Sequence, residues 1–389
     1  MSRDYAYQFI QGDLSRVTYA EPAISPTEQE LRLLNGTINK YLYGLAWHLG
    51  GFTLNDLNEQ WDWGADWDYN QRSGHIPTLE LLQVTRWPSA LLLAGGMIVL
   101  FALGWQVGQR PTAYLASLYY ALNPTLLLNG RRAMMESSLL LFGLLLVLAG
   151  IWFLRQPSWR TALLLGLSGG LALASKHTTV FALVAVFGSC LIYLLWTPRR
   201  LMPVIQLTLA GLLVLLVFYS LNPAWWGDPI SRASTVLELR ENLLETQVTV
   251  FGGYTGLGDQ IGGFARQVFI NTPQYYETAG WEQPLAEQIS TYETSPWRGI
   301  SIGGSVIGGV ILAILSMAGG WVLLRDATIA PATRWLVSVW ALGMIATTLL
   351  LTPLEWQRYY LPVYPVIGLL AALGLTRLFE TLKHLWSTG

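Results

Sequence analysis

The chain has 389 residues, a net charge of −1 and a charged fraction of only 12%, whereas a soluble domain carries about 25% charged residues. Because 52% of its residues are hydrophobic, an ordinary soluble domain is excluded and most of the chain is expected in lipid. The balanced charge and the lack of a basic face or nucleic-acid motif exclude nucleic acid as a partner. The only cysteine, Cys190, cannot form an internal disulfide.

The first part of the chain, residues 1–86, has no apolar run long enough to cross a bilayer and is rich in acidic, aromatic and Asn residues. We therefore expect a polar segment here. Within it, residues 29–49 place leucines near one side of a helix, whereas Asn35, Asn39 and Lys40 interrupt any span. This pattern predicts one helix at the membrane interface.

A tryptophan-rich stretch follows within the same segment and contains Asp62, Asp66 and Asp68. Its aromatic rings and carboxylates resemble a sugar-binding surface. It also resembles a calcium loop, but Gln71 and Pro77 stand where such a loop needs glycine and glutamate. The simplest interpretation is a loop that its tryptophans hold against the membrane surface.

From Trp87 onward, apolar runs of membrane-spanning length recur and predict about nine transmembrane helices. The fold class is therefore an all-α polytopic membrane protein. The runs cover residues 88–108, 112–128, 134–154, 161–175, 178–197, 203–221, 300–324, 332–352 and 360–380.

Positive charges concentrate at alternate turns between these runs, and such turns are expected in the cytoplasm. They are Arg110, Arg155, Arg160, Arg199, Arg200, Arg325, Arg334, Arg377 and Lys383. We therefore predict a multi-pass plasma-membrane protein with a cytoplasmic C-terminus. Its parts are an extracytoplasmic segment (1–86), a first set of spans (87–222), a long extracytoplasmic loop (223–298) and C-terminal spans (299–389).

This orientation places the N-terminal segment outside, although no preceding span or signal peptide in the sequence carries it across. Either the chain inserts in an unusual way, or a first span is absent from this sequence.

Two outer turns carry charges at the edge of hydrocarbon, where a charge is costly and needs a reason. Arg131, Arg132 and Glu136 stand at the start of the third run, and Lys176 with His177 stands between the fourth and fifth. Arginines there can bind a phosphate while the carboxylate orients a ligand. The structural alternative is a set of side chains that only anchor the helix ends.

The ends of two other runs carry the same ambiguity. Arg358 and Tyr359 open the last run, and Arg86 stands just before the first. Each arginine can hold an anionic headgroup, although aromatic residues with one arginine are also ordinary at span ends.

The sequence contains no His-Glu-x-x-His, Cys-x-x-Cys or Gly-x-Ser-x-Gly motif, so the common zinc and serine-hydrolase sites have no support. We therefore predict no cofactor and no metal site. Weak binding of a divalent ion by Asp62 and Asp66 is left open.

Several short motifs occur in the order found in GT-C membrane glycosyltransferases, specifically the branch of protein O-mannosyltransferases and the lipid A aminoarabinose transferase. Arg132-Ala-Met-Met-Glu-Ser-Ser-Leu resembles the family's Arg-x-x-Met-x-Asp-Ser-x-Leu, with Glu136 in place of aspartate. Ala174-Ser-Lys-His-Thr resembles its Ser-Lys-x-Thr turn, and Arg358-Tyr-Tyr-Leu-Pro-Val-Tyr-Pro resembles its C-terminal Arg-Tyr-x-Leu-Pro-x-x-Pro. Arg86 matches an arginine that leads into the family's second span. Lys40 stands for the lysine of a His-Pro-Pro-Leu-x-Lys stretch whose first part is missing here.

The resemblance implies transfer of a sugar from a polyprenyl-phosphate carrier to an acceptor on the outer side of the membrane. A carboxylate after the first span would take the proton of the acceptor hydroxyl, and Asp4 is its nearest counterpart. Glu136 would orient ligands, while Lys40, Arg86, Arg132, Lys176, Arg358 and Tyr359 would bind the substrate. The expected partners are a polyprenyl-phosphate-linked sugar and membrane lipids.

Two other functions fit the same sequence. One is a non-catalytic subunit that keeps the GT-C scaffold and binds partners in a membrane complex. The other is a transporter of lipid-linked sugars, although few charged residues lie within the spans and no internal repeat is present.

Overall fold

The computed structural model describes residues 2–197, 201–277 and 279–388, which are helical and contain no strand. Seven helices among these residues are long and apolar enough to cross a membrane, so the chain is an integral membrane protein. The predicted all-α membrane class is confirmed. Arg199 and Arg200, two of the predicted cytoplasmic charges, lie outside the described residues.

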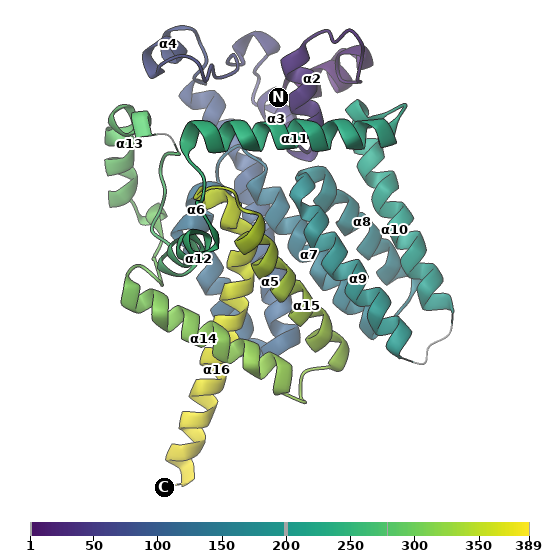
Figure 1. Cartoon of the computed structure of the whole chain (residues 1–389), viewed down its shortest axis with the longest axis vertical. Helices are drawn as coiled ribbons and strands as arrows, with labels where there is room; N and C mark the ends of the chain where they lie inside the picture. The colour runs from purple at the N-terminus through teal and green to yellow at the C-terminus, as the bar shows by residue number, and fades with distance from the viewer. Residues whose placement is uncertain (1, 198–200, 278, 389) are drawn as a thin grey trace.

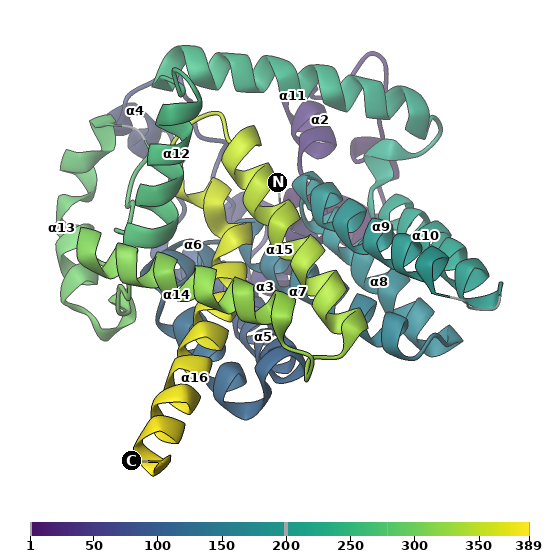
Figure 2. The same cartoon turned by 60° about the horizontal axis from the view of Figure 1, so that its bottom comes forward.

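The long helices form one bundle (Figures 1 and 2). They are α5 (Leu79–Leu122), α7 (Glu136–Arg155), α8 (Trp159–Ser175), α9 (Val180–Trp196), α10 (Met202–Leu221), α14 (Val306–Arg325), α15 (Pro331–Leu351) and α16 (Tyr364–Thr388). Helices α7 and α16 are the most buried and form the core, whereas most residues of α10 and α14 are at least partly exposed. An exposed apolar face is what a helix at the lipid boundary requires.

Small residues bring the helices of the bundle close together. Gly166, Gly169 and Gly170 of α8 lie against Val214 and Val217 of α10 and their neighbours, where an added Cβ would clash. Close approach at small residues is the usual basis of helix association in lipid, where burial of apolar surface gives no driving force.

The prediction of about nine spans differs from the seven helices because α5 contains two antiparallel arms. The backbone leaves the helical region at Gly108 and at Gln109, whose φ is 59°. Across this turn the rings of Phe101 and Tyr114 lie 5.1 Å apart, and Gly104 approaches the backbone of Ala113. The two predicted runs 88–108 and 112–128 therefore share one element. The second arm ends at Leu122, before the predicted boundary.

Another predicted run is shorter than expected for a span. Helix α8 has 17 residues and ends at Ser175, so it is not among the seven.

The second arm of α5 is followed by the short helix α6 (Pro124–Gly130), which the Asn123 side chain caps by accepting the Leu126 N–H at 3.0 Å.

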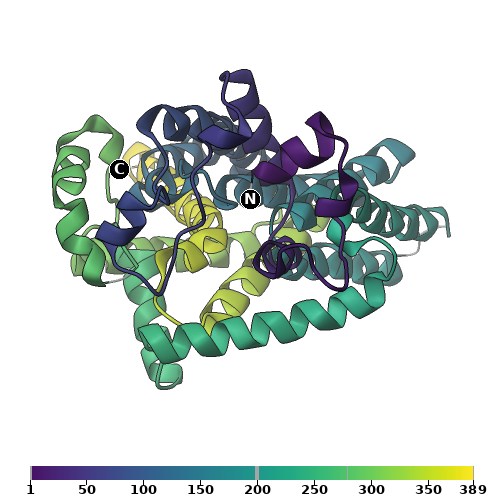
Figure 3. The ribbon, with the colours of Figure 1, turned by 90° about the horizontal axis from the view of Figure 1, so that it is seen from above.

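The polar elements gather at one end of the bundle, and the C-terminus lies at the opposite end (Figure 1). They include α1 (Arg3–Tyr5), α2 (Pro26–Leu34), α3 (Ile38–Leu49), α4 (Trp67–Arg72), α11 (Pro229–Phe251), α12 (Leu257–Ala265) and α13 (Glu282–Thr294). Helix α11 lies crosswise at this end in Figure 1 and runs along one edge of the molecule when it is seen from above (Figure 3). The predicted loop 223–298 is thus largely helical.

The single interfacial helix predicted over residues 29–49 is wrong, because α2 and α3 are separate helices. At the break, Gly36 lies against the carbonyl groups of Ala174 and Ser175, where no Cβ fits. The Thr37 hydroxyl donates to Oδ1 of Asn222 at 2.8 Å. These contacts with two distant turns separate α2 from α3.

Candidate active site

The first part of the site is a buried group of charges around Asp4. Arg32 Nε donates to Asp4 Oδ1 at 2.9 Å, and Lys40 Nζ lies 3.6 Å from Oδ2. Arg32 also pairs with Glu28 at 2.7 Å. Only 4% of Asp4 and 3% of Lys40 is exposed. Asp4 is therefore paired with two cations, and its Oδ2 accepts no hydrogen bond from a described residue.

Burial changes the acid–base behaviour of this group. It lowers the pKa of Lys40 to about 8, and the nearby charge of Arg32 acts in the same direction, while Asp4 opposes the shift. The Lys40 ammonium has no hydrogen-bond partner among the described residues. Lys40 was predicted as a substrate-binding residue, and in the structure its ion-pair partner is Asp4.

Packing of α3 against α1 positions Asp4. Gly44 of α3 lies directly against the Tyr5 side chain, and the rings of Tyr5 and Trp47 meet edge to face at 6.1 Å. Since Tyr5 is adjacent to Asp4, these contacts hold the carboxylate over Lys40, one turn earlier on α3.

The second part of the site lies where α7 begins and α8 ends, beside the segment that leads into α16. Glu136 at the start of α7 is buried and pairs with Lys176 at 3.2 Å. Arg358 pairs with Glu277 at 3.2 Å, and its guanidinium lies 5.5 Å from the ring centre of Tyr359. Burial raises the pKa of Glu277, while the charges of Arg358 and Arg132 oppose that shift. The two carboxylates and two cations thus alternate at one end of the bundle.

Beside this group, three arginines line a cavity of about 820 Å³. Arg86, Arg131 and Arg132 share it with mostly apolar neighbours such as Trp87 and Ile289. None of the three makes an ion pair with a carboxylate among the described residues. Arg131 donates to the Tyr292 hydroxyl at 2.6 Å, and Arg132 donates to the Tyr275 carbonyl at 3.2 Å. Burial lowers the pKa of Arg132. The cavity therefore combines apolar walls with three arginines that have no direct ion pair among the described residues.

Helix α3 connects the two parts. Lys40 faces Asp4, while the Tyr43 hydroxyl contacts Ser89 at 2.8 Å and donates to the Met134 carbonyl. Ser89 in turn donates to the carbonyl of Arg132 at 2.7 Å. One helix thus spans from the buried carboxylate to the turn that carries the arginines.

The structure brings most of the predicted site residues together in two groups. Arg132, Glu136, Lys176, Arg358 and Tyr359 converge at the ends of the bundle helices, with Arg86 at the edge of the adjoining cavity. Asp4 and Lys40 meet in the other group.

Sequence reasoning missed four charged residues of the site: Glu28, Arg32, Arg240 and Glu277. Arg240 of α11 is partly buried and donates to the Leu34 carbonyl at 3.1 Å. The signal for Arg32 is its spacing: it follows Glu28 by four residues on a helix that also carries apolar residues. Glu277 lies in an irregular segment and has no such signal.

The aspartates of the tryptophan-rich stretch have local structural roles. Asp66 accepts the Tyr69 N–H at 2.7 Å and caps α4, and Asp62 accepts the Gly64 N–H at 2.9 Å. No group of three or more His, Cys, Asp or Glu side chains in the described part of the chain is arranged to hold a metal ion.

Comparison with known proteins addresses the family resemblance and the fold. Residues 80–225 match the sequence profile of the dolichyl-phosphate-mannose-protein mannosyltransferase family. Among solved structures, apo ArnT from Cupriavidus metallidurans matches with a TM-score of 0.51 and 15% identity, over 97% of this chain. The chain has a GT-C-like fold. The predicted resemblance to GT-C glycosyltransferases is confirmed.

The GT-C-like chain spans about half the length of the structures it matches, since it covers 54% of apo ArnT. ArnT bound to undecaprenyl phosphate gives a TM-score of 0.49 at 15% identity, covering 97% of this chain and 55% of that one. The apo oligosaccharyltransferase of Archaeoglobus fulgidus gives 0.49 at 14% identity, covering 91% and 43%. A search of curated proteins found no significant match.

Proposed function

We propose that the protein transfers a sugar from a polyprenyl-phosphate carrier to an acceptor at the polar end of the bundle, on the outer side of the membrane. The observation that carries this function is the apolar cavity lined by Arg86, Arg131 and Arg132. A ligand that satisfies both features has an anionic head and an apolar tail. Arginine binds phosphate through fixed, paired N–H donors. The family match over residues 80–225 supports the same substrate.

In this reaction Asp4 acts as the general base. Its Oδ2 takes the proton of the acceptor hydroxyl while the acceptor oxygen forms a bond to the anomeric carbon of the donor sugar. The bond from the anomeric carbon to the phosphate oxygen breaks, and the polyprenyl phosphate leaves with the electron pair. Arg32 and Lys40 contact Asp4 and hold its carboxylate in place before the attack.

The cations of the site stabilise the charge that grows on the leaving phosphate. Arg86, Arg131 and Arg132 have no carboxylate to exchange for phosphate, so they are the first to bind it. Lys176 and Arg358 are held by Glu136 and Glu277 and orient the head of the carrier from the other side. Glu136 thereby acts as a positioning residue.

The experiment is a turnover assay on the full chain in lipid nanodiscs with radiolabelled polyprenyl-phosphate mannose and a membrane extract as acceptor source. We expect the label to move from the lipid to a water-soluble or acceptor-bound product. A double substitution of Arg86 and Arg132 to Ala should weaken donor binding by about a hundredfold or more, because it removes two charge-assisted phosphate contacts. Replacement of Arg72, which lies on α4 away from the cavity, by Ala is the matched control.

The rival functions give different outcomes in the same assay. A non-catalytic subunit binds the labelled lipid without turnover and retains partner proteins during purification. A transporter moves the labelled lipid between the leaflets of a proteoliposome without releasing the sugar. Either result would overturn the proposed transferase.

A further inference from the structure

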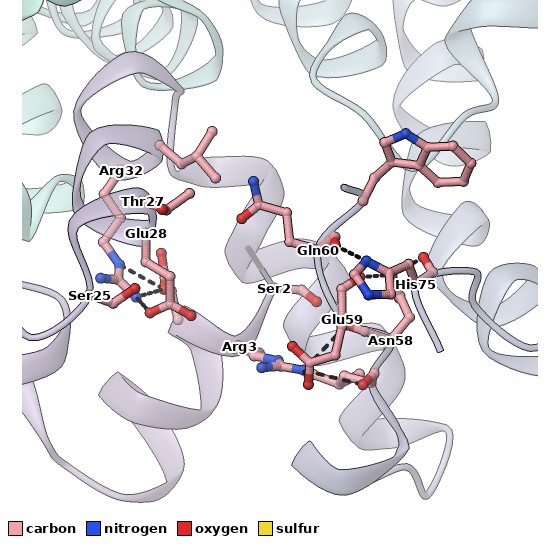
Figure 4. A pocket seen from close by; sticks show the side chains of 14 residues that line it. Ser2, Arg3, Ser25, Thr27, Glu28, Arg32, Asn58, Glu59, Gln60 and His75 are labelled. Atoms are coloured by element: carbon pink, nitrogen blue, oxygen red, sulfur yellow. Dashed lines mark hydrogen bonds and ion pairs between the residues drawn. The ribbon is translucent and has the colours of Figure 1, made fainter. Parts of the chain in front are cut away.

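Asp4 lies in the wall of a second cavity, of about 440 Å³, whose lining shares no residue with the arginine-lined one. Figure 4 shows this second cavity. Its walls come from the start of the chain, from α2 and from residues 57–61 with His75. None of these segments belongs to a helix long and apolar enough to span a membrane. The cavity therefore lies outside the helices that are able to span the membrane. Its volume lies within the range of small-molecule pockets, about 300–1,000 Å³.

The charged groups in this wall already have partners. Arg3 pairs with Glu59 at 2.9 Å, and Arg32 pairs with both Asp4 and Glu28. Figure 4 shows these pairs on opposite sides of the cavity. A charged ligand would have to break one of these ion pairs, and the stabilisation that the pair provides would be lost. A neutral ligand is therefore favoured.

Other polar side chains of the wall are unengaged. The hydroxyl groups of Ser25 and Thr27 and the side-chain amide of Gln60 line the cavity without a hydrogen bond to a described residue. Together they offer both donors and acceptors to a ligand. Such a mixture suits a molecule with several hydroxyl groups, each of which both donates and accepts.

An aromatic surface adjoins these groups. Trp61 lines the cavity and also contacts Trp63, Trp67 and Trp281, with ring centres 5.2 to 6.4 Å apart. Trp63 and Trp281 are stacked at 5.6 Å, and 63% of Trp63 is exposed. Aromatic rings pack against the apolar faces of sugar rings while their edges stay in contact with polar groups.

We infer that this cavity is the acceptor site and that the acceptor is a neutral saccharide, whose hydroxyl is presented to Asp4 and whose chain continues over the tryptophan surface. This inference rests on the proposed function, because it uses the same base. A peptide acceptor is disfavoured, since the described wall of the cavity supplies side-chain groups and no strand edge for an extended backbone.

The test measures saccharide binding and sugar transfer separately on the full chain in nanodiscs. The probes are neutral hexasaccharides of mannose and of glucose, compared with a Ser/Thr-rich peptide. We expect a hexasaccharide to bind and to gain one sugar by mass spectrometry when the polyprenyl-phosphate donor is added. The T27A/Q60A double variant should bind it about tenfold more weakly, since two hydrogen bonds are lost.

Binding of undecaprenyl phosphate should be unchanged in T27A/Q60A, because neither residue lines the arginine cavity. The matched control is Q11A/N55A, which removes two exposed side chains of the same segment that lie outside the pocket. Unchanged saccharide affinity in T27A/Q60A, or transfer to the peptide in place of the saccharide, would overturn the inference. Saccharide binding without consumption of the donor would instead overturn the proposed function and leave the binding site standing.

Discussion

Replacement of Asp4 by Asn separates the chemical role of this residue from its structural role. The variant keeps the size and shape of the side chain but removes its charge and its ability to take a proton. Arg32 retains Glu28 as a partner at 2.7 Å, whereas Lys40 loses its nearest carboxylate. Removing one partner of a buried ion pair costs about 3–5 kcal/mol of unfolding free energy. Because only one of the two cations is left unpaired, we expect the lower end, about 3 kcal/mol.

The turnover rate of D4N should fall by more than the loss of folded protein accounts for. A positioned general base contributes about 10²–10⁴-fold to the rate. The double variant D4N/K40M removes the unpaired cation as well, so it should regain most of the lost stability and none of the lost activity. Denaturant unfolding in nanodiscs gives the stability, and release of labelled polyprenyl phosphate gives the rate.

Two outcomes would refute this reasoning. If D4N retained about a tenth or more of wild-type turnover, Asp4 would not be the base, since general-base loss costs about a hundredfold or more. If D4N were as stable as the wild type and K40M added nothing, the charges around Asp4 would not be coupled in the way their distances indicate.

Three further predictions follow from single contacts. Burial gives Lys40 a pKa of about 8 in the folded chain against 10.5 in the unfolded chain, so the unfolded chain binds more protons in that range. Stability should therefore rise by about 3 kcal/mol between pH 8 and 10.5; denaturant unfolding at each pH, compared with K40M, tests this, and an equal rise in K40M would contradict it. Replacing Glu136 by Gln should raise the KM for the donor, because Lys176 loses the charge that orients it. The unfolding free energy measured without donor should change little, and the conservative E136D should restore the KM. Replacing Gly36 by Ala should lower the unfolding midpoint, because the new Cβ meets the Ser175 carbonyl; G256A, at an extended position with open space around it, is the matched control and should leave the midpoint unchanged.

The sequence by itself was sufficient for the membrane class and for the side on which the charges gather. Apolar runs of about 20 residues are a local signal, because the thickness of the bilayer sets their length. The turns at Arg132, Lys176 and Arg358 were identified in the same way, since a charge at the edge of hydrocarbon is conspicuous in a linear pattern. Their convergence on one end of the bundle agrees with that prediction.

The tertiary structure decided which charges meet. Asp4 and Arg32 are 28 residues apart, and Arg358 pairs with Glu277 of a distant irregular segment. No local pattern specifies such pairs, because an ion pair depends on how two segments pack and not on their spacing in the chain. The turn at Gly108 and Gln109, by contrast, falls where the sequence predicts a break, because Arg110 stands between two apolar runs. The hydropathy of a segment predicts whether it lies in lipid or in water. The site depends instead on contacts between residues that only folding brings together.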